Sequence, residues 1–86
     1  VYNIAVAHRD GIGVAQNYAR AFEYFQKAAA MGYVKAYWGL ASLYHNGQGT
    51  ARDCSRALEN FYRARQLGNT DAGLAKDIDT AEKNCR

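Results

Sequence analysis

The sequence predicts an all-α fold: a superhelix, or solenoid, of antiparallel helix pairs with a C-terminal capping helix. The first observation behind this prediction is a repeat at an offset of 36 residues, which pairs small and aromatic residues: Ala5 with Ala41, Ala21 with Ala57, Phe25 with Phe61, Ala28 with Ala64 and Gly32 with Gly68. Repeats of about 20–50 residues are typical of solenoids, in which each unit buries its apolar face against the next. The second observation is that apolar residues within a unit follow helical spacing.

The first helix of a unit is clearest in the second repeat, where the apolar residues fall on one side of a helix: Ala36, Leu40, Leu43 and Tyr44. The stretch Asn-Gly-Gln-Gly over 46–49 ends this helix. Val1 aligns with Tyr37, one residue after the alanine that opens the helix. We therefore expect the first copy of this helix to lack its beginning, and further repeats to precede it.

The second helix of each unit begins at a capping side chain, Asn17 in the first repeat and Asp53 in the second. Its apolar stripe in the second repeat is Ala57, Leu58, Phe61 and Ala64. Gly32 and Gly68 stand where a helix end favours a residue that tolerates positive φ. Alanines let the helix backbones approach, while phenylalanines fill the space between them.

The end of the chain follows a different pattern. Lys76 and Thr80 align with Leu40 and Tyr44, so the core pattern of the repeat is lost there. A new apolar stripe replaces it at helical spacing: Leu74, Ile78, Ala81 and Cys85. A helix with one apolar and one polar side suits the end of a repeat array, and we expect Arg86 to be close to the natural end. The chain then divides into three segments: an N-terminally incomplete repeat over 1–35, a repeat over 36–71 and a capping helix over 72–86.

Composition excludes several classes of protein. A chain of 86 residues has room for one domain or a piece of an array, and none for a large enzyme fold. No run approaches the ~18 apolar residues that a membrane-spanning helix needs. The net charge is +3 and the pI about 9.0, but no block of like charges occurs, so we expect no nucleic-acid partner.

The repeat resembles a known family. The residues that carry the resemblance are Tyr44-His45-Asn46-Gly47-Gln48-Gly49, Ala57-x-x-x-Phe61-Tyr62-x-Ala64 and Gly68-x-x-x-Ala72. This pattern, present across nearly the whole chain, is similar to the Sel1-like repeat, a relative of the tetratricopeptide repeat with a longer turn between its helices. The resemblance implies an adaptor that assembles complexes, acts in signalling, or mediates bacterial contact with hosts or competitors, including neutralisation of secreted effectors.

Cys54 opens the second helix of its unit and Cys85 closes the antiparallel capping helix, so the two thiols could meet. A disulfide between them would imply an oxidising compartment such as a periplasm or the extracellular space. Two ordinary half-buried cysteines in a cytoplasmic protein are the alternative.

Residues that could carry catalysis are sparse. His8 and His45 are the only histidines, and the spacing places no nucleophile or carboxylate near both. Asp77 and Asp79 are two apart on a helix, do not face each other, and are interpreted as solvating the cap. We expect no enzymatic activity, no cofactor and no metal site.

Seven residues are predicted to bind a partner: Tyr2, Val6, Arg9, Tyr37, Trp38, Ser42 and His45. Except for Tyr37, they occupy matched positions on the first helices of the two units, which generally line the concave side of such stacks. Tyrosine and tryptophan there could anchor a partner, and Tyr24, Tyr33 and Tyr62 are secondary candidates with Tyr37. Packing between repeats is the alternative for this stripe, because Leu74 and Ile78 align with Trp38 and Ser42.

The sequence thus favours a non-enzymatic scaffold that binds a protein or peptide on its concave surface, with a bacterial periplasmic immunity-type inhibitor as the preferred form. Two other interpretations stay open. One is a cell-wall-linked enzyme or β-lactam-binding protein, because some cysteine-rich relatives have been linked to β-lactam binding. The other is a purely structural C-terminal segment. The open N-terminal repeat could also self-associate.

Overall fold

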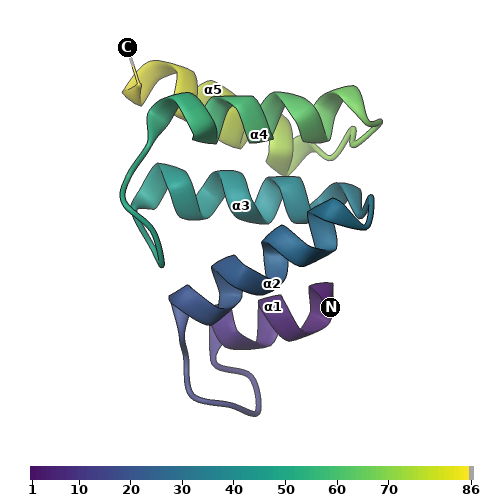
Figure 1. The fold of residues 1–86 in the computed structure, drawn as a ribbon. Helices are drawn as coiled ribbons and strands as arrows, with labels where there is room; N and C mark the ends of the chain where they lie inside the picture. Colours follow the sequence, from purple (N-terminus) through teal and green to yellow (C-terminus); the bar gives the residue numbers. More distant parts are fainter. Residues whose placement is uncertain (86) are drawn as a thin grey trace.

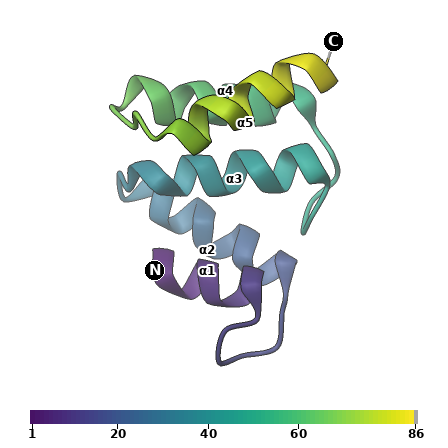
Figure 2. The ribbon, with the colours of Figure 1, turned by 180° about the vertical axis from the view of Figure 1, so that it is seen from behind.

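The computed structural model describes residues 1–85, which form five α-helices and no strand. Their bounds are α1 Tyr2–Asp10, α2 Tyr18–Ala30, α3 Val34–Asn46, α4 Cys54–Gln66 and α5 Ala72–Asn84. Helices α1, α3 and α5 form one layer, and α2 and α4 form the other (Figures 1 and 2). The predicted superhelix of antiparallel helix pairs is confirmed.

The helix ends follow the local chemistry of the sequence. The side chain of Asn17 accepts a hydrogen bond from the backbone N–H of Arg20 at 3.1 Å, and Asp53 accepts one from Arg56 at 3.0 Å. Both predicted N-caps are therefore confirmed. Gly32 has a φ of +87°, as a left-handed helix end requires.

Helix α3 begins two residues before the predicted start at Ala36. The backbone N–H of Tyr33 bonds to the carbonyl of Ala28 at 3.1 Å, so the chain reverses directly after Gly32. Only residues 31–33 connect the two helices, and the new helix begins at Val34. The predicted segment boundaries at 35 and 71 stay predictions.

Alanine makes the close packing of the helices possible. Seven alanines are fully buried: Ala5, Ala21, Ala36, Ala41, Ala57, Ala64 and Ala81. Gly39, in the middle of α3, allows an even closer approach than alanine would, because a Cβ atom there would lie 2.5 Å from a ring carbon of Phe25 on α2. The aromatic ring thus packs directly on the backbone of the next helix.

Helix α5 caps the stack as predicted. Leu74, Ile78 and Ala81 are buried in one cluster with Phe61 of α4, while Lys76 and Thr80 are exposed. Cys54 and Cys85 form a disulfide with their Cα atoms 5.5 Å apart, joining the start of α4 to the end of α5. Arg86, the last residue of the predicted cap, lies outside the described residues.

Candidate binding surface

The layer of α1, α3 and α5 carries two adjoining pockets, one on each side of Ser42. The first lies between α1 and α3, has a volume of about 230 Å³, and is called the α1–α3 pocket; its lining residues are Tyr2, Arg9, Lys35, Trp38, Gly39 and Ser42. The second, also about 230 Å³, is called the α3–α5 pocket; its lining residues are Ser42, His45, Asn46, Phe61, Asp77 and Thr80. Successive helices of one layer thus leave recesses between them.

Two cationic side chains line the α1–α3 pocket, Arg9 and Lys35. Arg9 makes two hydrogen bonds to the carboxylate of Asp10, at 3.0 and 3.2 Å. This bonding holds the pKa of Asp10 below its usual value and raises that of Arg9. The guanidinium also lies 5.7 Å from the ring centre of Phe25, so it is held in place from two sides.

Trp38 connects α3 to the capping helix. Its indole N–H donates a hydrogen bond of 2.8 Å to a carboxylate oxygen of Asp77. The side chain is half-buried, which agrees with packing between repeats, yet it also lines the α1–α3 pocket. The prediction that Asp77 only solvates the cap was wrong, because this carboxylate satisfies a part-buried donor. Asp79 does face solvent, where it pairs with Lys83.

Five of the seven predicted binding residues line the two pockets: Tyr2, Arg9, Trp38, Ser42 and His45. Ser42 and His45 are half-buried. The Nε2 atom of His45 is buried and has no hydrogen-bond partner.

Val6 and Tyr37 lie elsewhere. Val6 is half-buried against the core cluster of the first repeat and lines neither pocket. Tyr37 lines a recess on the α4 side with Tyr62 and Arg63, whose guanidinium is 6.0 Å from the Tyr37 ring centre. One helical step separates Tyr37 from Trp38, and that step of about 100° turns the two side chains to different sides of α3.

The secondary candidates are also dispersed. The Tyr24 ring stacks on His8 with a centroid distance of 5.7 Å. The hydroxyl of Tyr62 donates to Glu82 of the capping helix at 2.8 Å. Tyr33 stacks on Tyr2, with 4.7 Å between ring centres.

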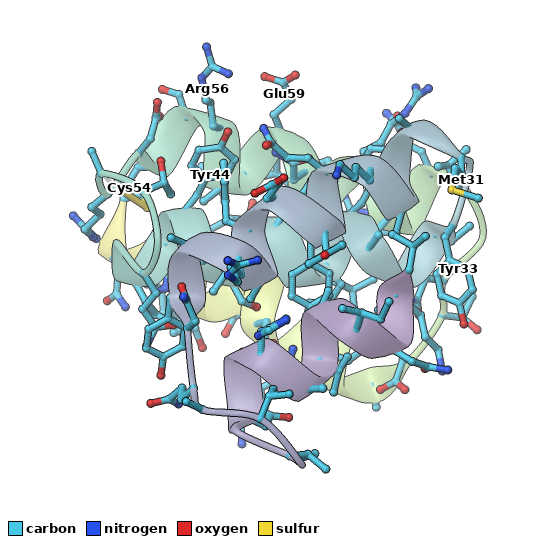
Figure 3. The ribbon with its side chains drawn as sticks, turned by 60° about the horizontal axis from the view of Figure 1, so that its bottom comes forward. Met31, Tyr33, Tyr44, Cys54, Arg56 and Glu59 are labelled. Atoms are coloured by element: carbon cyan, nitrogen blue, oxygen red, sulfur yellow. A yellow bond between two sulfur atoms is a disulfide. The ribbon has the colours of Figure 1, made fainter. Side chains whose placement is uncertain are left out.

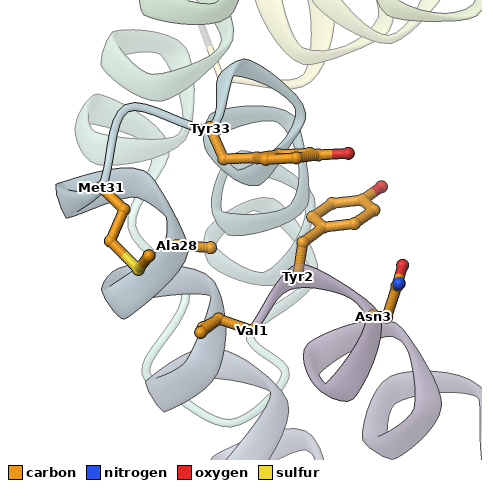
Figure 4. Close-up of a pocket in the computed structure, with 6 residues that line it drawn as sticks. All are labelled: Val1, Tyr2, Asn3, Ala28, Met31 and Tyr33. Atoms are coloured by element: carbon orange, nitrogen blue, oxygen red, sulfur yellow. The ribbon is translucent and has the colours of Figure 1, made fainter.

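Tyr2 and Tyr33 belong to a further recess, the N-terminal pocket, of about 220 Å³ (Figure 4); it is lined by Val1, Tyr2, Asn3, Ala28, Met31 and Tyr33. Figure 3 shows Met31 and Tyr33 together, far from Cys54 in that view. Met31 is 75% exposed. Ile4 is 46% exposed, whereas its counterpart Leu40 in the second repeat is only 6% exposed, so this end of the stack carries an uncovered apolar face.

Six residues that line the two pockets were not predicted from the sequence to bind: Lys35, Gly39, Asn46, Phe61, Asp77 and Thr80. A glycine inside a helix pattern indicates close packing, and that feature could have identified Gly39. Lys35 precedes the apolar stripe of its helix and looked like any exposed lysine. Nothing in the sequence near Asp77 indicated its role, because its partner Trp38 is 39 residues away.

The disulfide occupies both cysteine thiols. The Nδ1 atom of His8 is buried without a hydrogen-bond partner, beside the ring of Tyr24. Within residues 1–85, no group of three metal-ligating side chains comes together. Over the same residues, no helix combines the length and the apolar character that crossing a bilayer requires.

Comparisons with known proteins agree with this geometry. A family model described as the Sel1 repeat matches residues 1–33 and 34–69. Among solved structures, the chain is similar to c5321, described as a protective antigen present in uropathogenic Escherichia coli strains displaying an SLR fold. That match has a TM-score of 0.77 and 32% sequence identity, and it covers 79% of this chain and 15% of that one.

Cysteine rich protein B of Helicobacter pylori is similar in fold, with a TM-score of 0.75 at 22% identity; the match covers 83% of this chain and 53% of that one. The chain therefore spans 15% and 53% of the lengths of these two structures. No sequence among the curated proteins is significantly similar to the chain.

Proposed function

This chain belongs to the Sel1 repeat family, and from that premise we propose that it binds a protein or peptide partner on the surface formed by α1, α3 and α5. Sel1 repeat proteins are generally protein-interaction scaffolds and are typically not enzymes. The observation that supports this surface is that two adjoining pockets share Ser42 and are lined by five residues predicted from sequence to bind. Aromatic and arginine side chains, which dominate binding energy in protein interfaces, are among them.

A substitution at Ser42 tests this proposal, because Ser42 lines both pockets and a long charged side chain there obstructs the surface that they form. We expect Ser42→Arg to abolish capture of a partner that wild-type protein retains from native-host extract, as measured by quantitative mass spectrometry. Ser55→Arg is the matched control, because Ser55 is an exposed residue on α4 that lines neither pocket. Partners that Ser42→Arg retains as well as Ser55→Arg does would contradict a role for this surface.

Within this function, we favour a bacterial envelope protein whose partner is a secreted effector that it neutralises. The disulfide between Cys54 and Cys85 supports an oxidising compartment, since such bonds are rare in the cytosol. Thiols of protein from its native host should be blocked under denaturing, non-reducing conditions and appear only after reduction. Two free thiols would instead direct the partner search to cytoplasmic complexes.

Self-association through the N-terminal pocket is a second candidate. The uncovered apolar side chains Val1, Ile4 and Met31 favour it. In a two-fold dimer the N-terminal surfaces of two copies would contact each other, so that apolar residues meet apolar residues. A contact with the other end of the stack is less favourable, because the outer side of α5 exposes polar residues such as Lys76 and Thr80.

A further inference from the structure

The α1–α3 pocket has an unbalanced set of polar groups. Its polar side chains are those of Arg9, Lys35, Ser42 and Tyr2, and no carboxylate lines it. Two of these side chains are cations, and the other two are hydroxyls that can donate. A pocket with this lining is complementary to an anionic group.

The donors retain bonding capacity. Lys35 makes no ion pair or hydrogen bond within residues 1–85. Arg9 uses its Nε and one terminal nitrogen on Asp10, so part of its five-donor fork is unused. Its bond to Asp10 fixes the direction of the guanidinium without placing a negative charge in the pocket lining. Preorganised donors of this kind lose little entropy when an anion binds.

The walls of the pocket add apolar area beside the cations. Tyr2 comes from α1 and Trp38 from α3, and the backbone at Gly39 completes this part of the lining. Hydrogen bonds hold Trp38 to Asp77, and ring stacking holds Tyr2 to Tyr33. Fixed aromatic walls beside cations suit a segment in which an acidic residue is next to an apolar one.

The α3–α5 pocket has the opposite character. Its charged side chain is the carboxylate of Asp77, and its other polar side chains are those of Ser42, His45, Asn46 and Thr80, which can accept as well as donate hydrogen bonds. One oxygen of Asp77 accepts the bond from Trp38, and its other oxygen remains available. The surface therefore has cationic donors on one side of Ser42, in the α1–α3 pocket, and a carboxylate acceptor on the other side, in the α3–α5 pocket. This difference in charge gives a bound segment a preferred direction.

We propose that the α1–α3 pocket binds a carboxylate of an acidic partner peptide through Arg9 and Lys35, with a neighbouring apolar residue of the peptide against Tyr2 and Trp38. The acidic residue lies at the α1 side of Ser42, and the peptide continues toward Asp77. This inference rests on the proposed function, because it identifies the chemistry of the partner for the same surface.

Peptide selection on the intact chain tests the proposal. The probe is a phage-displayed library of random 12-residue peptides, selected in parallel on wild-type protein and on Lys35→Glu and Arg20→Glu. Glu near the start of α3 is compatible with the helix dipole, so Lys35→Glu should fold, as circular dichroism can verify. Arg20→Glu is the matched control, because it makes the same change of charge at an exposed position of α2 outside both pockets.

The strongest peptide is then synthesised in two forms, one acidic and one with each Asp or Glu replaced by its amide. Trp38 is the only tryptophan of the chain and lines the pocket, so its fluorescence reports binding. We expect selected peptides to pair Asp or Glu with an aromatic or large aliphatic residue. Lys35→Glu should bind the acidic peptide at least tenfold more weakly than wild type does. The amide peptide should bind wild-type protein at least tenfold more weakly than the acidic peptide does, and Arg20→Glu should bind the acidic peptide as tightly as wild type.

The outcomes separate this inference from the proposed function. Peptides that change Trp38 fluorescence but have no acidic bias, or that bind Lys35→Glu as well as wild type, would overturn the carboxylate site and leave the binding surface intact. Selection of no peptide, or binding that leaves Trp38 unchanged, would overturn both.

Discussion

A Cβ atom on Gly39 would lie within 2.5 Å of the Phe25 ring, so the residue at this position sets how closely α2 and α3 can pack. Glycine inside a helix costs about 1 kcal/mol relative to alanine. The chain tolerates that cost because the fully buried ring of Phe25 packs directly against the backbone at Gly39.

Gly39→Ala should therefore destabilise the protein although alanine is the better helix former. We expect the overpacking to lower the free energy of unfolding by about 1–3 kcal/mol, as measured by urea denaturation. Adding Phe25→Leu to Gly39→Ala should cost less than the sum of the two single changes, because the smaller side chain leaves room for the methyl group. A more stable Gly39→Ala variant would show that the close approach is not limiting.

Asp77 satisfies the indole N–H of Trp38 across two helices. Asp77→Ala leaves that part-buried donor without its partner, which should cost about 1–3 kcal/mol of stability. The emission of Trp38 should shift at the same time, because its immediate environment changes. Asp79→Ala is the control: it removes only an exposed pair with Lys83, so its effect should stay below about 1 kcal/mol. Equal effects of the two substitutions would argue against a structural role for the Trp38–Asp77 bond.

At the scale of helices, α5 lies in the same layer as α1 and α3 but differs from them in its pattern of apolar and polar residues. It buries Leu74, Ile78 and Ala81 against α4 and presents polar residues outward, which is what the end of a stack requires. Its attachment is reinforced midway by the bond from Trp38 to Asp77, in the last turn by the bond from Tyr62 to Glu82, and at its end by the disulfide. The cap therefore holds one wall of the α3–α5 pocket in place.

Removing the disulfide should loosen this helix first. The bond closes a loop between residues 31 positions apart, so the double variant Cys54→Ser/Cys85→Ser should lose about 2–4 kcal/mol of stability. Amide hydrogen exchange should become fastest in α5, because this helix packs against the stack on one side only and its other side is exposed. A reductant should destabilise wild-type protein to the same degree and leave the double variant unchanged. Uniform exchange across all five helices would contradict local release of the cap.

At the scale of the whole molecule, the two ends of the stack are chemically different. The outer side of the C-terminal end is polar on α5, whereas the N-terminal end exposes Ile4 and Met31. Because Leu40, the counterpart of Ile4, is covered by the preceding helix pair, an apolar partner surface fits the N-terminal end. This asymmetry makes the first repeat the expected site of self-association.

Sedimentation equilibrium measures this association directly. We expect wild-type protein to form dimers with rising concentration, and Met31→Glu to keep it monomeric, because a charge in an apolar contact is costly. Leu67→Glu is the matched control, since Leu67 is the counterpart of Met31 in the second repeat. A dimer that persists in Met31→Glu would place the contact elsewhere.

Periodicity and local spacing were sufficient to predict the helices, the N-caps at Asn17 and Asp53 and the capping role of α5. These features depend on residues within a few positions of one another, and a repeat carries the same local pattern twice. Five of the residues predicted to bind line the two adjoining pockets, because matched positions on stacked helices share a side; that they bind a partner stays a prediction.

The pairs that connect different helices could be found only in the tertiary structure. Trp38 and Asp77, or Gly39 and Phe25, meet because the packing angle and rise of the superhelix bring them together, and single-helix patterns do not specify those quantities. The same reason explains why Tyr37 lies apart from the other predicted binding residues, since the turn of α3 directs it toward α4. The cationic character of the α1–α3 pocket likewise arises only when Arg9 and Lys35, 26 residues apart in the sequence, face each other across two helices.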